Sequence, residues 1–142
     1  MDYEHYKLKS YTQWDLYLHQ NQYYLGRMYL WAKGENRNVD MTQMTPEEHT
    51  EWWQICQQIR TVLNTMFKPD RINWSWLQNE QSHDHHLHMH IVPRYESPRL
   101  FGGYRFVDEQ PFANWSPYPK EMPSALAITV PTVCSKLKEA FA

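Results

Sequence analysis

The chain has 142 residues and a formal net charge of −2 at neutral pH. This length suits a single domain over residues 1–142, with enough chain to bury a sizeable core. The weak net charge and the lack of a long basic run argue against a nucleic-acid groove or an anionic membrane surface, so any phosphate binding must be local.

The cysteine content and the first thirty residues bear on the compartment. Cys56 and Cys134 are too few for a disulfide framework or a four-cysteine zinc site, which favours a reducing compartment. The first thirty residues mix charged and aromatic side chains, a composition typical of neither a signal peptide nor a membrane span. We therefore expect a cytoplasmic protein that does not contact membranes.

The first part of the chain predicts a hairpin. Residues up to Trp14 show no clear period. Apolar and polar residues alternate over 15–19 and again over 23–32, which predicts two strands joined by a polar turn at 20–22. Residues 33–40 are polar and include a glycine, which predicts a loop.

A long helix should follow this loop. Thr45 suits the N-cap, Pro46 the first helical position and Glu48 the capping box, so the helix should begin here. Apolar residues then recur at the helical period as far as Phe67. Alternation over 72–76 predicts the next strand.

Three histidines alternate with apolar residues in the strand that should come next. Because side chains in a strand point to opposite faces in turn, His86, His88 and His90 should share one face. Their spacing of roughly 6.6–6.8 Å along the strand would let one anionic group touch two of them. The intervening residues should point into the core: Leu87, Met89 and Ile91.

The last third of the chain has less pattern. Residues 95–123 are rich in proline, glycine and aromatic side chains, which predicts a long segment packed on the surface. Val133, Leu137 and Phe141 have helical spacing and predict a short helix over about 132–141. The order of strands, one strong helix and further strands indicates an α+β fold with an antiparallel sheet.

Residues 86–92 read His-Leu-His-Met-His-Ile-Val, which resembles the signature of the histidine triad (HIT) family of nucleotide hydrolases and nucleotidyl transferases. The family pattern is His-x-His-x-His-x-x, with x apolar. The Pro-Arg-Tyr at 93–95 is similar to the hydrolase side of the family, whereas the transferase branch usually has glutamine at the position of His90. The resemblance covers roughly 17–95. It implies a HIT-like antiparallel sheet with one long helix and a short C-terminal helix, in a branch resembling the dinucleoside polyphosphate hydrolases.

The resemblance also implies the roles of site residues. His88 would be the nucleophile, His90 would donate to the phosphate and His86 would help to hold the site together. Many relatives have a further histidine before the long helix, where this chain offers at best Asn38. Polar residues near positions that contact the nucleotide or its leaving group in relatives are Asn73, Asn79, Gln81 and Ser82.

Two further substrate contacts follow from residue chemistry. The guanidinium of Arg94 suits the outer phosphates of a polyphosphate, with a surface ion pair as an equally good interpretation. Asn21 could touch a ribose from the first hairpin, although a solvated turn residue is the stronger interpretation.

Imidazole chemistry is consistent with this function. A neutral imidazole is available near pH 7 and can attack phosphorus to give a phosphoramidate, which water then hydrolyses. Donors around the phosphorus would offset the charge on its oxygens. We expect a nucleotide phosphohydrolase that cleaves a nucleotidyl phosphoanhydride or phosphoramidate through a nucleotidyl-histidine intermediate.

A histidine-rich zinc- or nucleotide-binding module without turnover is the alternative, since His83 and His85 precede the triad and imidazoles bind zinc. For the enzyme we assign no metal ligand and no required cofactor, although a divalent metal could accompany the nucleotide. Family resemblance also predicts a homodimer with Trp52 or Trp53 of the long helix at the interface.

Overall fold

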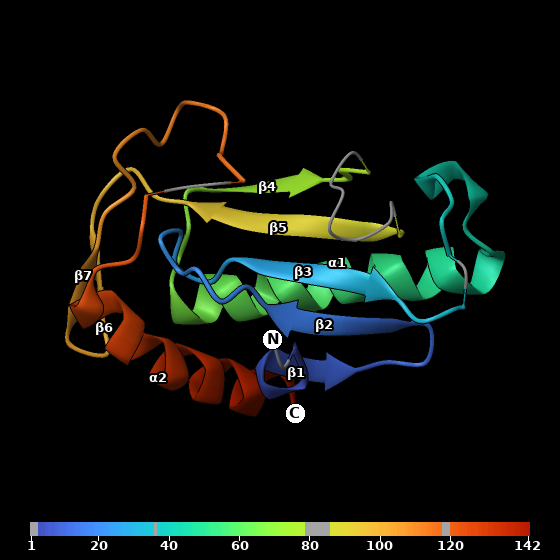
Figure 1. The fold of residues 1–142 in the computed structure, drawn as a ribbon, viewed down its shortest axis with the longest axis horizontal. Coiled ribbons are helices and arrows are strands. Elements are labelled where there is room, and N and C mark those ends of the chain that lie inside the picture. Colours follow the sequence, from blue (N-terminus) through green and yellow to red (C-terminus); the bar gives the residue numbers. More distant parts are fainter. Residues whose placement is uncertain (1–2, 36, 79–85, 118–119) are drawn as a thin grey trace.

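A five-stranded antiparallel sheet forms the centre of the protein (Figure 1). The computed structural model describes residues 3–35, 37–78, 86–117 and 120–142. The strand order is β1-β2-β3-β5-β4, so β1 and β4 are the edges. The bounds are β1 Lys7–Ser10, β2 Trp14–Leu18, β3 Met28–Ala32, β4 Arg71–Ser75 and β5 His88–Arg94. The predicted α+β class with an antiparallel sheet is confirmed.

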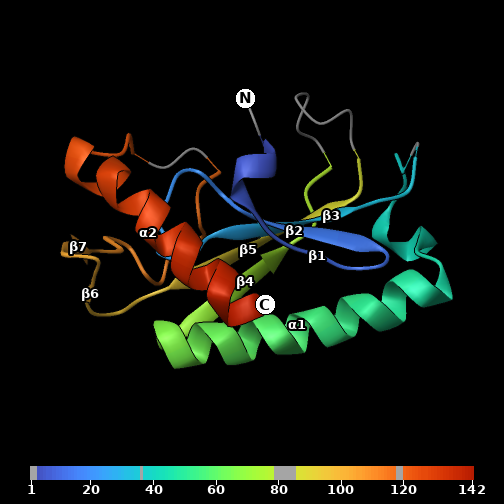
Figure 2. The ribbon, with the colours of Figure 1, turned by 90° about the horizontal axis from the view of Figure 1, so that it is seen from below.

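Two helices, α1 (Pro46–Met66) and α2 (Ser124–Phe141), pack against the same face of the sheet. α1 runs beneath the strands and the C-terminal half of α2 lies next to it (Figure 2). The core between the helices and the sheet contains the alternate residues of β5 and its neighbours, among them Leu16, Met28, Leu30, Leu87, Met89 and Ile91. The prediction that the last three point into the core is confirmed, and the histidine face lies opposite the helices.

Helix α1 begins where its capping residues predict. The Thr45 hydroxyl accepts a hydrogen bond from the Glu48 backbone N–H at 3.1 Å, and the Glu48 carboxylate accepts one from the Thr45 N–H at 2.8 Å. Glu48 is buried and also pairs with Arg37 at 2.5 Å, which ties the preceding loop to the first turn of the helix. This reciprocal cap satisfies backbone donors that the helix itself leaves open.

The turn between β2 and β3 is longer than predicted, because β3 begins only at Met28. The amide side chain of Gln22 is fully buried there and donates to the carbonyls of His19 and Arg27, at 2.7 and 3.0 Å. Its oxygen accepts from the N–H of Gly26, whose φ is +85°. A buried side chain that takes over these backbone hydrogen bonds holds the segment in a loop instead of a strand.

Several short elements were not predicted, among them β1 and a 3-10 helix, η2, at Met41–Gln43. A short 3-10 helix, η1 (Tyr3–Tyr6), leads into β1 before Trp14. The segment predicted as a structureless surface stretch contains a hairpin, β6 (Arg99–Phe101) and β7 (Tyr104–Phe106). The Gly102–Gly103 turn of this hairpin has φ values of +58° and +80°, which glycine adopts readily.

The C-terminal helix is longer than predicted. α2 begins at Ser124 and contains Pro131, which removes one main-chain hydrogen bond within the helix. The helix continues because its inner face, including Val130, Val133 and Leu137, is buried against the core. No helix in the described part of the chain is long and apolar enough to cross a membrane.

Candidate active site

The triad lies at the centre of the sheet face that the helices leave uncovered. β5 runs between β3 and β4, and directly opposite residues of antiparallel strands share a face. His88 lies opposite Trp31 of β3, and His90 lies between Tyr29 of β3 and Ser75 of β4. The structure therefore brings the strand histidines together with aromatic and hydroxyl side chains from both neighbouring strands.

The imidazole nitrogens of the triad are oriented by main-chain carbonyls. Nδ1 of His88 is 2.7 Å from the carbonyl oxygen of His86, and Nε2 of His86 is 2.8 Å from that of Ala32. Because a carbonyl can only accept, both of these nitrogens must carry the proton. In a neutral His88 the lone pair is therefore on Nε2. The rings of His88 and His90 lie with centroids 5.0 Å apart, edge to face, and both side chains are buried.

Trp31 packs against the first two histidines. Its indole is parallel to the ring of His86, with centroids 4.2 Å apart and 5° between planes, and lies 5.5 Å from the ring of His88. Asn38, the candidate replacement for the upstream histidine, is exposed. The triad is thus supported by an indole on β3. The alternation over 23–32 implies that Trp31 and Tyr29 share one strand face, but nothing in the sequence indicated which strand that face would meet.

Trp115 covers the other end of the triad. Its indole centroid is 5.1 Å from that of His90, and its N–H donates to the Ser75 hydroxyl at 2.9 Å. The Arg27 guanidinium lies 5.2 Å over the same indole. Trp115 comes from the aperiodic segment after β7, so no sequence signal connected it with the histidines.

An aromatic surface borders the triad on the β3 side. Tyr17 and Tyr29 stack with centroids 5.0 Å apart and 12° between their planes, and Tyr29 shares the face of His90. Burial, with a smaller effect from Tyr17, raises the pKa of Tyr29 above its ordinary value, so its hydroxyl stays protonated at neutral pH. Tyr17 is buried and the Lys7 ammonium lies 5.8 Å over its ring, so Tyr29 is the more accessible of the two rings. A flat aromatic side chain of this kind suits a nucleobase.

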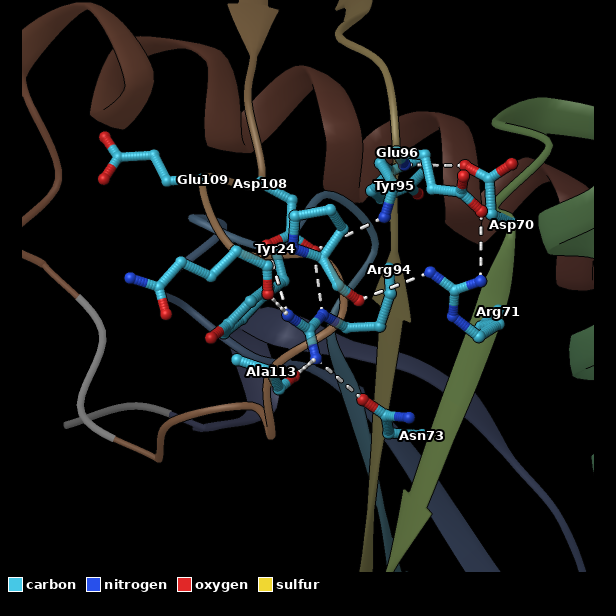
Figure 3. Close-up of polar contacts among 12 residues, drawn as sticks. Tyr24, Asp70, Arg71, Asn73, Arg94, Tyr95, Glu96, Asp108, Glu109 and Ala113 are labelled. Carbon is cyan, nitrogen blue, oxygen red and sulfur yellow. Dashed lines mark hydrogen bonds and ion pairs between the residues drawn. The ribbon is translucent and has the colours of Figure 1, made fainter.

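Arg94 is buried in a polar network at the end of β5 (Figure 3). Its five N–H donors match five acceptor contacts: two to the Asp108 carboxylate at 2.8 and 3.2 Å, and one each to the Asn73 amide oxygen, the Gln110 carbonyl and the Ala113 carbonyl, at 3.0, 2.7 and 2.6 Å. A phosphate could reach Arg94 only by displacing one of them. The substrate roles of Arg94 and Asn73 stay predictions, and the contacts shown anchor residues 108–113.

The structure gives no contact between the triad and the remaining predicted substrate residues that it describes. The side chain of Asn21 accepts from the N–H of Tyr23 at 3.0 Å, a local bond typical of turns. Its ribose contact stays a prediction. The other positions lie outside the described residues: Asn79, Gln81 and Ser82, together with His83 and His85 of the metal alternative.

Neither a metal cluster nor a reactive thiol is evident in the described ranges. Among those residues, no group of three or more His, Cys, Asp or Glu is arranged to hold a metal ion. Burial raises the pKa of the Cys56 thiol to about 12, and burial also raises the pKa of Cys134. Both thiols therefore stay protonated at neutral pH and are poor nucleophiles.

Comparison with known proteins finds one family model that matches part of the chain. The family model of the HIT domain matches residues 35–97, which include the long helix and the triad strand. This match confirms the resemblance to the histidine triad family that the sequence motif indicated. A search of curated proteins found no match.

Solved structures with this fold include two bacterial histidine triad proteins. That of Marinobacter aquaeolei is 18% identical with a TM-score of 0.67, and that of Bradyrhizobium japonicum is 15% identical with a TM-score of 0.69; each match covers 96% of this chain and 90% of the other. The diadenosine triphosphate hydrolase of Plasmodium falciparum is 11% identical with a TM-score of 0.58, over 98% of this chain and 80% of that one. At these identities the comparison establishes the shared fold.

Proposed function

We propose that this protein is a nucleotide hydrolase that cleaves a nucleotidyl phosphoanhydride or phosphoramidate, of the dinucleoside polyphosphate type, through a covalent intermediate on His88. The observation that carries the proposal is the hydrogen bond from Nδ1 of His88 to the His86 carbonyl. This bond leaves the lone pair on Nε2, on the sheet face that also holds His90. The HIT domain match supports a nucleotide as the substrate.

The reaction takes place in two displacements. In the first, Nε2 of His88 forms a bond to phosphorus, and the bond from phosphorus to the leaving group breaks with its electron pair going to that group. The positive charge that develops on the imidazole is stabilised by the His86 carbonyl, which accepts the hydrogen bond from the Nδ1–H of His88. His90 donates to a phosphoryl oxygen and offsets its charge. In the second, water attacks phosphorus, the P–N bond breaks, and neutral His88 is restored once the proton of water is released.

We place the nucleobase of the substrate on the stacked pair of Tyr17 and Tyr29. The pair adjoins His90 through the register of β3 with β5. Base stacking on an aromatic side chain contributes about 1–3 kcal/mol per base, so this surface would supply part of the free energy that binds the nucleoside near the triad. The covalent step needs no metal, although a divalent ion could accompany a polyphosphate substrate.

We also propose a cytoplasmic homodimer. The edge strand β4 and helix α1 together border an apolar groove of about 600 Å³, lined in part by Trp52, Trp53 and Trp74. Trp53 and Trp74 are exposed. A second copy related by a two-fold axis would cover both the open strand edge and this groove.

Replacement of His88 tests the function. His88→Asn should lower turnover of a dinucleoside polyphosphate by roughly three orders of magnitude or more, because the attacking nitrogen is lost. Binding of the substrate, measured by calorimetry, should remain. His49→Asn is the matched control, since His49 is exposed on α1. Activity of His88→Asn within a few-fold of the parent would contradict the assignment.

Trapping the covalent intermediate provides a second, independent test of the proposed mechanism. Acid-free quenching early in the reaction should leave a nucleotidyl mass on the peptide that contains residues 86–94, stable to alkali and labile to acid. His90→Ala should slow its formation without moving it. Inversion of configuration at a chirally labelled phosphorus, with no trapped mass, would mean that water attacks directly. Binding of nucleotide or zinc by the parent without turnover would instead indicate a binding module.

A further inference from the structure

Trp115 closes one end of the triad by contacting β4, β5 and the residue that precedes β3. It contacts Arg27 immediately before β3, His90 on β5 and Ser75 at the end of β4. These three strands are adjacent in the sheet. A single indole therefore spans the sheet face across the width of the triad strand and both its neighbours.

The face beyond Trp115 is covered as well. Val92 follows the triad on the same side of β5, and it is fully buried although it is not part of the helix-side core. Arg94, the next residue on that side, is 2% exposed, with its donors directed at residues 108–113. A substrate cannot extend along β5 past His90 without displacing this segment.

The contacts of Trp115 hold its indole in one position over the sheet. Its only polar atom donates to Ser75, and the guanidinium of Arg27 lies over its ring. The next residue, Ser116, donates its N–H to the Tyr24 hydroxyl at 3.0 Å. Arg94 holds the earlier part of the segment through the buried Asp108. The indole is thus restrained by its own contacts and from both sides along the chain.

We propose that Trp115 is a specificity-determining residue that limits the size of the group leaving phosphorus. The inference rests on the proposed hydrolase function. In an in-line displacement the leaving atom lies opposite the attacking Nε2, which places it above the sheet. Trp115 stands on that side of the sheet next to His90, so it restricts how far the leaving group can extend in its direction. Substrates with compact leaving groups are therefore cleaved faster than substrates with longer ones.

A series of substrates with the same nucleotidyl half isolates this effect. We would measure kcat/KM for a nucleoside phosphoramidate, a dinucleoside triphosphate and a dinucleoside tetraphosphate, whose leaving groups increase in length. The parent should favour the short end of the series. Trp115→Ala should raise the ratio of the longest to the shortest substrate by about tenfold or more, because steric exclusion by a side chain is worth at least that much.

Graded variants and a control guard against loss of folding. Trp115→Leu and Trp115→Phe should shift the same ratio by smaller amounts, in the order of the volume removed, and they keep an apolar side chain over His90. Phe112→Ala is the matched control, since Phe112 is 78% exposed in the same segment and its ring packs on Arg71. Its ratio should equal that of the parent.

The outcomes separate the two proposals. If the parent and the variants turn over these substrates and the ratio stays within twofold across the Trp115 series, the inference is overturned and the hydrolase function stands. If the parent turns over none of the three, the hydrolase function fails and the inference fails with it. A ratio of kcat/KM for the longest to the shortest substrate that rises in the order Trp115→Phe, Trp115→Leu, Trp115→Ala supports the inference.

Discussion

Trp31 positions two of the three imidazoles, and its effect on catalysis can be measured. It lies parallel to His86 and against His88. The hydrogen bond from Nδ1 of His88 to the His86 carbonyl fixes the tautomer of His88. Trp31→Leu should lower kcat about tenfold while KM changes little, because a loosened ring spends less time in line with phosphorus. Trp31→Phe should restore most of kcat, since a flat ring is again available to stack.

The control for this prediction is Phe112→Leu, which removes an exposed aromatic ring elsewhere and should leave both constants unchanged. Equal losses in kcat for Trp31→Leu and Trp31→Phe would show that stacking does not matter. A rise in KM alone would place Trp31 in substrate binding instead.

At the residue scale, local periodicity predicted the histidines but not their surroundings. Alternation along one strand was enough to assign His86, His88 and His90 to one face. Trp31 and Trp115 meet them through strand pairing and through a long aperiodic segment, and neither contact leaves a local pattern in the sequence. The triad was therefore predictable and the two indoles that border it were not.

The Arg94–Asp108 ion pair holds the segment after β7 on the sheet, and its removal should destabilise the fold. Both side chains are buried, each 3% exposed. Arg94→Met should lower the free energy of unfolding by about 3–5 kcal/mol, because the Asp108 carboxylate would be left buried without its partner. Urea denaturation measures this change.

Arg94→Met combined with Asp108→Leu should lose clearly less than Arg94→Met alone, since no charge is then stranded. Lys120→Met is the control, because Lys120 forms an exposed pair with Glu109 and should change stability little. If the double variant is as unstable as the single one, the stabilisation comes from the hydrogen bonds to Asn73 and the main chain and not from the pair.

Elements with a chemical signal at their ends were predicted best. The Thr45 cap and the proline that follows it located the start of α1. Pro131 had the opposite effect, because a proline normally marks the limit of a helix and the prediction began α2 after it. The short strands β6 and β7 carry too few residues to show a period. Burial of Gln22 likewise has no signature in a polar turn.

At the scale of the whole molecule, the exposed tryptophans beside β4 predict the assembly. Trp53 is 55% exposed and Trp74 is 38% exposed. The parent should have a dimeric mass by light scattering at micromolar concentration, and Trp53→Glu should shift it to a monomer, because a charge would be buried at the interface. Ile128→Glu is the control, since Ile128 is equally apolar and 77% exposed on α2. A monomeric parent would contradict the proposal.

The strand order also has a consequence for how the site forms during synthesis. β3 pairs with β5, which follows it by roughly 60 residues, so the two halves of the triad face meet only through a long-range contact. While the ribosome makes α1 and β4, the inner edge of β3 has no partner and its apolar residues are open to wrong pairing. The segment with Trp115 emerges later still. A nascent chain therefore cannot form the triad face until β5 has emerged, and α2, which completes the hydrophobic core, emerges after both.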